Sequence, residues 1–159
     1  MLLISLTRLR VRSFRYLLQF VWQALKTARQ AERASGFLGG RLLREARNTF
    51  WTITAWEDEA AMRAYRNAGA HRAVMPRLLN WCDEAAVAHW SQETSALPEW
   101  REAHQRLVKE GKSSKVNHPS PAHVANHIAE PQPSRVERIL KPPRSGKPGV
   151  QSNQERRFM

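Results

Sequence analysis

The stretch that most constrains the fold is a run of β-branched and aromatic residues that leads directly into a helix. Residues 49–56 read Thr-Phe-Trp-Thr-Ile-Thr-Ala-Trp, a composition that favours an extended strand. Asp58 follows where its side chain can cap the free amides of a new helix, and Ala61, Met62 and Tyr65 then recur at helical spacing. The sequence therefore predicts a strand followed at once by a helix.

Both faces of this predicted strand lack charge. Alternate residues of a strand point to opposite sides, so Phe50 and Trp56 share one face while Trp51 and Ile53 share the other. A two-layer α+β domain covers only one face of its sheet with its own helices. We therefore expect the other face to pack against a second copy of the same sheet, in a homodimer.

An amphipathic helix is predicted upstream of this stretch. Residues 1–11 alternate as a strand, and Ser13 is placed to cap the helix that follows. That helix has apolar residues at i, i+3, i+4 and i+7, a pattern typical of a core-facing stripe, with a membrane-surface helix as the alternative. The stripe comprises Phe14, Leu17, Leu18, Val21, Trp22, Leu25 and Ala28.

Residues 37–45 predict a second strand that forms a hairpin with residues 49–56. Gly39-Gly40 within it indicates a bulge or a close backbone approach, and Arg47-Asn48 supplies the turn.

A third helical segment and a fourth strand complete the predicted domain. Asn67-Ala68-Gly69 breaks the helical pattern, and residues 70–82 resume it with Val74, Leu78 and Trp81 on one face. Pro76 predicts a kink or a restart in that segment. Residues 85–90 read as the fourth strand.

The order of elements over residues 1–92 is β-α-β-β-α-β, the ferredoxin-like arrangement of an α+β fold. A C-terminal helical extension is predicted within residues 93–111, where Trp100, Ala103 and Leu107 share a face. Residues 112–159 show no periodicity and are rich in proline and basic residues. We expect this segment to be a disordered tail.

The net charge of +12 is concentrated toward the C-terminus. Residues 1–100 carry 14 Lys and Arg against 9 Asp and Glu, whereas residues 101–159 carry 12 against 5. Because the basic tail lacks interleaved aromatic residues, we expect it to keep the chain in solution rather than to bind a specific nucleic acid. The single cysteine, Cys82, together with the absence of a signal peptide and of any long apolar run, predicts a cytoplasmic protein without a membrane span.

The central stretch resembles the antibiotic biosynthesis monooxygenase superfamily over residues 1–92. The segments that carry the resemblance are Gly36-Phe37-Leu38-Gly39, the strand of residues 50–56, Ala61-Met62-Arg63-Ala64-Tyr65 and Ala70-His71-Arg72. Within the superfamily, residues 56–64 with the later His-Arg pair are similar to the spheroidene monooxygenase branch. The resemblance implies a dimeric α+β barrel.

The resemblance also implies a function. We expect a monooxygenase that acts on a hydrophobic aromatic or polyene small molecule, either without a cofactor or in association with haem. The alternative is a non-catalytic dimeric protein that binds haem or another apolar ligand on the same scaffold.

Two residues are candidates for catalysis and four for a substrate pocket. His71 could transfer a proton or ligate haem, and Tyr65 could hydrogen-bond a substrate oxygen. The expected pocket is lined by Trp22, Trp51, Trp56 and Met62. For each of these six residues, simple packing in the core or at a helix end is the alternative interpretation.

Three histidines in the C-terminal segment suggest a metal site. His118, His123 and His127 could supply imidazole ligands, but Pro119 and Pro121 flank them without preorganising them, and no cysteine accompanies them. We therefore expect no metal bound by this chain.

Overall fold

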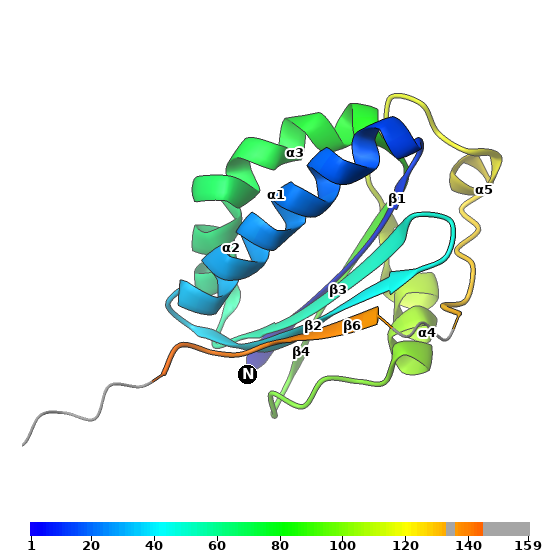
Figure 1. Ribbon diagram of the computed structural model, residues 1–159. Helices are drawn as coiled ribbons and strands as arrows, with labels where there is room; N and C mark the ends of the chain where they lie inside the picture. Colours follow the sequence, from blue (N-terminus) through cyan, green and yellow to red (C-terminus); the bar gives the residue numbers. More distant parts are fainter. Residues whose placement is uncertain (133–135, 145–159) are drawn as a thin grey trace, which may run out of the picture.

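The computed structural model describes residues 1–132 and 136–144. Its elements, shown in Figure 1, are β1 (Leu2–Val11), α1 (Phe14–Arg33), β2 (Phe37–Glu45), β3 (Thr49–Trp56), α2 (Glu59–Arg66), α3 (Gly69–Trp81), β4 (Cys82–Gln92), α4 (Trp100–Glu110), β5 (Lys112–Ser113), α5 (Pro121–Val124) and β6 (Val136–Leu140).

The strands form one antiparallel sheet with the order β5-β4-β1-β3-β2-β6. β1 lies at its centre and pairs with β3 on one side and β4 on the other. Elements β1 to β4 with α1 to α3 give the predicted ferredoxin-like α+β arrangement. The helical caps are also confirmed, because Ser13 accepts from the Arg15 amide and Asp58 accepts from the Ala61 amide at 2.8 Å.

The β2–β3 hairpin follows the predicted register. Arg47 and Asn48 both adopt positive φ, at 59° and 57°, as the tight turn between antiparallel strands requires. The register shifts between Phe37 and Gly39, which confirms the bulge. At Gly40 a Cβ atom would lie 2.8 Å from the Ile53 carbonyl oxygen, so only glycine allows the two strands to approach this closely there.

The break after α2 is confirmed, whereas the effect of Pro76 is not the predicted restart. α3 begins at Gly69, whose φ of 53° favours glycine, and runs as one helix to Trp81 with Pro76 inside it. β4 is longer than expected, because its pairing with β1 extends from Cys82 to Gln92.

Helices α1, α2 and α3 cover one face of the sheet (Figure 1). Two hydrophobic clusters fill the space between these helices and the strands. One contains Leu3, Phe37 and Trp56 of the sheet with Ala28, Ala31 and Met62 of the helices, and the other contains Val11, Phe20, Val74, Trp81, Cys82 and Ala85.

The predicted inward stripe of α1 is confirmed at Leu17, Val21 and Ala28, which pack in the core, and is wrong at Phe14, Leu18 and Trp22. Phe14, Leu18 and Trp22 are 80%, 81% and 58% exposed, whereas Phe20, Ala28 and Ala31 are buried. α1 carries more apolar residues than one face can bury, so periodicity alone cannot select the face. The small side chains of Ala28 and Ala31 allow α1 to approach the sheet closely, and this packing turns Trp22 outward.

The second face of the sheet is covered by the chain's own α4, on the opposite side from α1 (Figure 1). Ala103 and Leu107 of α4 are fully buried against a surface formed by Ile4, Leu6, Trp51, Ile53, Ala86, Ala88 and Trp90. The expectation that both faces of β3 are covered is confirmed. The inference that a second copy must cover this face is corrected, because α4 supplies the apolar surface that the face requires.

The expectation of a disordered segment from residue 112 is also corrected for residues 112–132 and 136–144. β6 pairs with β2, and Leu140 is 2% exposed in the cluster around Trp56. Glu32 of α1 accepts from the Lys141 amide and lies 3.9 Å from the Arg138 guanidinium. The sequence pattern missed these contacts because each element is too short to show a period. Residues 133–135 and 145–159 lie outside the described residues.

Within the described part of the chain, no helix combines the length and the apolar character that crossing a bilayer demands.

Candidate functional site

An open groove of about 660 Å³ lies on the helical side of the domain. It lies between the C-terminal half of α1 and the segment formed by α2 and the start of α3. Alanines form much of its floor, and three cations, Lys26, Arg29 and Arg33, line its α1 side. The full lining is Lys26, Arg29, Gln30, Arg33, Ala34, Ser35, Ala61, Ala64, Tyr65, Ala68 and Ala70.

Tyr65 is the aromatic residue of the groove. Its ring stacks on Trp56 at 4.9 Å, and its hydroxyl donates to the Thr27 carbonyl at 3.2 Å. Burial raises the pKa of Tyr65 to about 12, and the Thr27 contact opposes this only in part. The phenol is therefore protonated at neutral pH, where it can donate a hydrogen bond but cannot act as a base.

Gln30 joins α1 to the break between α2 and α3. Its side-chain amide donates to the carbonyls of Tyr65 and Ala68 at 3.0 and 2.8 Å, and its oxygen accepts from the His71 amide at 2.9 Å. One side chain thus ties α1 to the end of α2 and to the first turn of α3, where the His71 amide has no helical acceptor. Sequence reasoning did not single out Gln30, because its importance depends on contacts across about forty residues of chain.

His71 lies behind Tyr65 and is absent from the groove lining. Its ring meets the Tyr65 ring edge-on at 4.9 Å, and its Nδ1 lies 3.2 Å from the Arg66 carbonyl at the end of α2. Burial lowers the pKa of His71, although the Arg66 carbonyl favours the charged form. A neutral imidazole that donates from Nδ1 satisfies this arrangement.

The residues expected to line one pocket are separated in the structure. Trp56 and Met62 lie together in the cluster beneath Tyr65. Trp51 lies on the opposite face of the sheet, against α4, and Trp22 is on the exposed side of α1. The structure therefore brings together Trp56, Met62, Tyr65 and His71, and it places Trp22 and Trp51 elsewhere.

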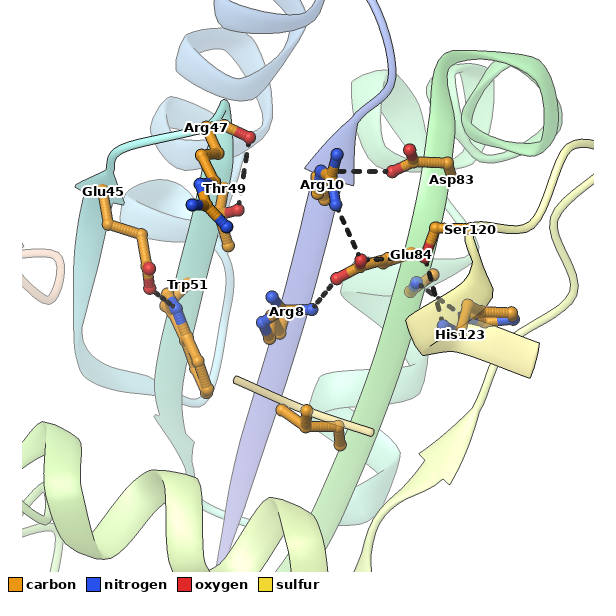
Figure 2. A network of polar contacts seen from close by, with 12 residues as sticks. Arg8, Arg10, Glu45, Arg47, Thr49, Trp51, Asp83, Glu84, Ser120 and His123 are labelled. Atoms are coloured by element: carbon orange, nitrogen blue, oxygen red, sulfur yellow. Dashed lines mark hydrogen bonds and ion pairs between the residues drawn. The ribbon is translucent and has the colours of Figure 1, made fainter. Parts of the chain in front are cut away.

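A buried polar network occupies the α4 side of the sheet, near its edge toward α5 (Figure 2). Arg8 of β1 donates to Glu84 of β4 at 2.6 Å, and both side chains are only 6% exposed. Arg10 and Ser120 also donate to Glu84, at 2.9 and 2.8 Å. Although burial alone would raise the pKa of Glu84, these donors and the positive charges of Arg8 and Arg10 hold it below its ordinary value.

This network links the sheet to the C-terminal segment. The Ser120 hydroxyl donates to Glu84 and accepts from the His123 amide. It therefore caps α5 and at the same time bonds this segment to β4. Nearby, the Trp51 indole donates to Glu45, and the Arg8 guanidinium lies 5.6 Å above the Trp51 ring. One sequence signal could have indicated this network: Arg8 interrupts the apolar positions Ile4 and Leu6 on one face of a central strand.

The candidate metal and haem ligands do not assemble into a site. Among residues 1–132 and 136–144, no three His, Cys, Asp or Glu side chains are grouped so that they could hold a metal ion, and this includes His118, His123 and His127. The groove lining, all within the described residues, contains no His, Cys or Met, and burial raises the pKa of Tyr65 to about 12, which disfavours the phenolate that would ligate iron. The groove residues therefore do not fit an axial ligand for haem.

The strand and helix arrangement around the groove is shared with a known family. Residues 19–77 match the model of the antibiotic biosynthesis monooxygenase family. The chain has the antibiotic biosynthesis monooxygenase fold. The matched region contains the whole lining of the groove together with Trp56 and His71. Members of this family are typically dimeric.

Solved structures share the antibiotic biosynthesis monooxygenase fold at low sequence identity. SnoaB from Streptomyces nogalater, a cofactor-independent oxygenase solved as a point mutant, is 22% identical with a TM-score of 0.50, and the match covers 62% of this chain and 98% of that chain. A conserved protein from Methanosarcina mazei Go1 is 12% identical with a TM-score of 0.52, over 58% and 93% of the two chains.

A third solved structure, that of an antibiotic biosynthesis monooxygenase, is 12% identical with a TM-score of 0.52, over 58% and 99% of the two chains. No curated protein matches the chain. The shared region leaves α4 and the following C-terminal elements outside the family match.

The lowered pKa of His71 predicts a pH dependence of stability. The unfolded chain binds the proton at the ordinary pKa of 6.5, before the folded chain does, so stability falls as the pH drops below that value. The substitution His71→Asn keeps a donor for the Arg66 carbonyl and removes the titration.

We expect the free energy of unfolding of His71→Asn to fall less steeply below pH 6.5, by up to about 1.4 kcal/mol per pH unit. Urea denaturation of both proteins across this range measures the difference. His89, whose pKa is also lowered, is common to both proteins and cancels in the comparison. Parallel pH curves would contradict the prediction.

Proposed function

We propose that this chain is a monooxygenase that binds a hydrophobic aromatic or polyene molecule in the groove between α1 and α2. The observation that carries the proposal is the groove itself, in which an alanine floor and the Tyr65 ring provide an apolar surface inside the region that matches the family. A volume of about 660 Å³ lies within the range of small-molecule sites.

The cations of the groove narrow the class of ligand. Lys26, Arg29 and Arg33 are exposed along one side of the groove, opposite the alanines of α2. An apolar molecule that carries a carboxylate, sulfonate or phenolate group would place its rings on the alanines and its charge beside these residues. We therefore propose an amphipathic anion as the substrate.

The chemistry proposed here needs no reductant. Oxidation of a substrate methylene group to a carbonyl takes four electrons from the substrate, which reduce O₂ so that one oxygen atom enters the product and the other leaves as water. In this scheme the protonated Tyr65 donates a hydrogen bond to a substrate oxygen in place of the Thr27 carbonyl. His71 acts as a positioning residue that supports the Tyr65 ring from behind.

The alternative is a non-catalytic protein that binds an apolar ligand in the same groove. It is favoured by one observation: the groove lining contains Tyr65 but no residue that could act as a general base at neutral pH. The narrower similarity to the spheroidene monooxygenase branch, and with it haem, stays a prediction. An absorption spectrum of the purified protein tests for haem through its Soret band.

Filling the groove is expected to weaken binding of an apolar anion by at least about tenfold. Ala64 is exposed on the groove floor, so Ala64→Leu adds volume there without disturbing the core. The matched control is Ala60→Leu, an exposed position of the same helix that is not part of the groove. Fluorescence titration with anilinonaphthalene sulfonate measures the affinity, and equal affinities in the two variants would contradict the assigned site.

The role of the cations is tested with a second probe. Phenyl-naphthylamine has the same rings without the sulfonate, so Arg29→Gln should weaken binding of the sulfonated probe only.

Dioxygen uptake with a hydroxylated polycyclic aromatic then separates the monooxygenase from the non-catalytic binding protein. Uptake that Tyr65→Phe abolishes supports the monooxygenase, whereas probe binding without uptake by the parent protein supports the binding protein.

The homodimer stays a prediction for this chain. The sheet face that was expected to form its interface is occupied by α4, so a pair of copies would have to use a different surface or displace α4. Light scattering of the full chain at micromolar concentration measures its mass directly.

A further inference from the structure

The outward face of α1 presents an apolar stripe that nothing in the described part of the domain covers. Phe14, Leu18 and Trp22 are spaced four residues apart, so they lie one above the other on the same side of the helix. Their exposed fractions are 80%, 81% and 58%. α3 lies beside α1 in the helical layer (Figure 1). It carries an exposed apolar residue of its own, Met75, which is 45% exposed.

The charges around this stripe have one sign. α1 and α3 together contain six Lys and Arg residues and a single acidic residue. That acid, Glu32, is engaged by Arg138 and by the Lys141 amide of the C-terminal segment. The basic residues are Arg15, Lys26, Arg29, Arg33, Arg72 and Arg77, and all six are exposed.

We propose that the outer face of α1 docks on an anionic lipid bilayer, with Phe14, Leu18 and Trp22 in the headgroup region. A helix that lies in a membrane interface combines Trp, Phe and Leu on one side with Lys and Arg beside them, and this is the exposed composition of α1. Trp is also the residue that favours the boundary between headgroups and acyl chains.

Charge complementarity selects the bilayer over a second copy of this chain. A symmetric contact through α1 would bring two surfaces of six basic residues together, and like charges across an interface oppose association. An anionic bilayer attracts the same residues and accepts the apolar stripe. The groove opens beside this face, since Lys26, Arg29 and Arg33 line it. The docking proposal stands independently of what the groove binds.

The test is co-sedimentation of the full chain with vesicles that contain about 30% phosphatidylglycerol in phosphatidylcholine. The variant Phe14→Ser, Leu18→Ser and Trp22→Ser should lower the partition coefficient by at least about tenfold. Val108→Ser is the control, because Val108 is 58% exposed on α4, on the opposite side of the sheet. It should partition like the parent protein. Binding should also weaken by about fivefold for each basic residue of α1 that is neutralised.

Fluorescence locates the contact in the unaltered protein. Of the six tryptophans, all within the described residues, Trp22 alone has more than half of its side chain exposed. Lipids brominated near the headgroup should therefore quench a component of the emission that Trp22→Phe removes.

Three outcomes would overturn the proposal. Vesicle binding that is equal in the triple variant and the parent would place the contact elsewhere. Absence of binding of the parent protein to anionic vesicles would show that this face does not dock on a bilayer. A concentration-dependent dimer that only the triple variant loses, without vesicle binding, would show that a second copy covers the stripe. Ala64→Leu should leave vesicle binding unchanged, so failure of the groove assignment remains a separate result.

Discussion

A chain that ends at Gly111 is expected to have a free energy of unfolding about 3–6 kcal/mol lower than that of the full chain. Among its described residues, the removed segment carries two buried apolar side chains, Val116 and Leu140, which are 9% and 2% exposed. Complete burial of such a side chain contributes about 1.5–3 kcal/mol. The truncation also uncovers β2, because β6 is its edge partner, and it removes Ser120 from Glu84.

Urea denaturation of a chain that ends at Arg144 provides the matched control. That chain keeps every contact counted above, so the difference between the two truncated chains measures residues 112–144 alone. Equal denaturation midpoints would show that this segment does not contribute to folding, as its composition suggested. A free energy loss confined to the shorter chain would establish it as part of the domain.

The second large effect is expected at the buried ion pair. Glu84→Gln should lower the free energy of unfolding by about 3–5 kcal/mol, because it leaves the charge of Arg8 buried without a counter-charge. Arg10 is less affected, since 35% of its side chain is exposed and water can solvate it. The measurement is urea denaturation at neutral pH.

A double variant separates the pair from simple packing. Arg8→Met with Glu84→Leu replaces both charges with apolar groups of similar size, and such replacements are often neutral or stabilising. We expect the double variant to be more stable than Glu84→Gln. If the two are equally destabilised, the loss comes from packing in this region and the assignment to the ion pair is wrong.

The ion pair also predicts the response to acid. The pKa of Glu84 is lowered by folding, so the unfolded chain takes up the proton at a higher pH. The stabilisation is present above the ordinary pKa of 4.5 and is lost as the pH falls below it. Because Glu84→Gln removes the titrating group, the free energy of unfolding of this variant should lack this pH dependence. Urea denaturation of both proteins at acidic pH therefore tests the ion pair a second time.

Local chemistry explains which features could be predicted from the sequence. Ser13 and Asp58 cap helices through bonds to amides within three residues, and Arg47-Asn48 forms a turn through its own backbone angles. The strand of residues 49–56 follows from its β-branched and aromatic composition. Each of these features depends on contacts inside one short segment, so the sequence shows it directly.

The candidate site was only partly predictable for the same reason. Tyr65 and Met62 were indicated by helical spacing, and the structure places them with Trp56 beside or beneath the groove. Gln30 was missed, because its role is to bond three backbone groups that lie far along the chain. Trp22 was assigned to the pocket because a stripe of apolar residues does not reveal which side faces the sheet.

By itself, the sequence determined the ferredoxin-like order of elements and the apolar character of both sheet faces. Only the tertiary structure decided what covers each face: α1 turns Ala28 and Ala31 inward, and α4 seats Leu107 on the face of Trp51. It also decided that β6 pairs with β2 across about a hundred residues of chain. These choices depend on shape complementarity between distant segments, and neither spacing nor composition within one segment records that complementarity.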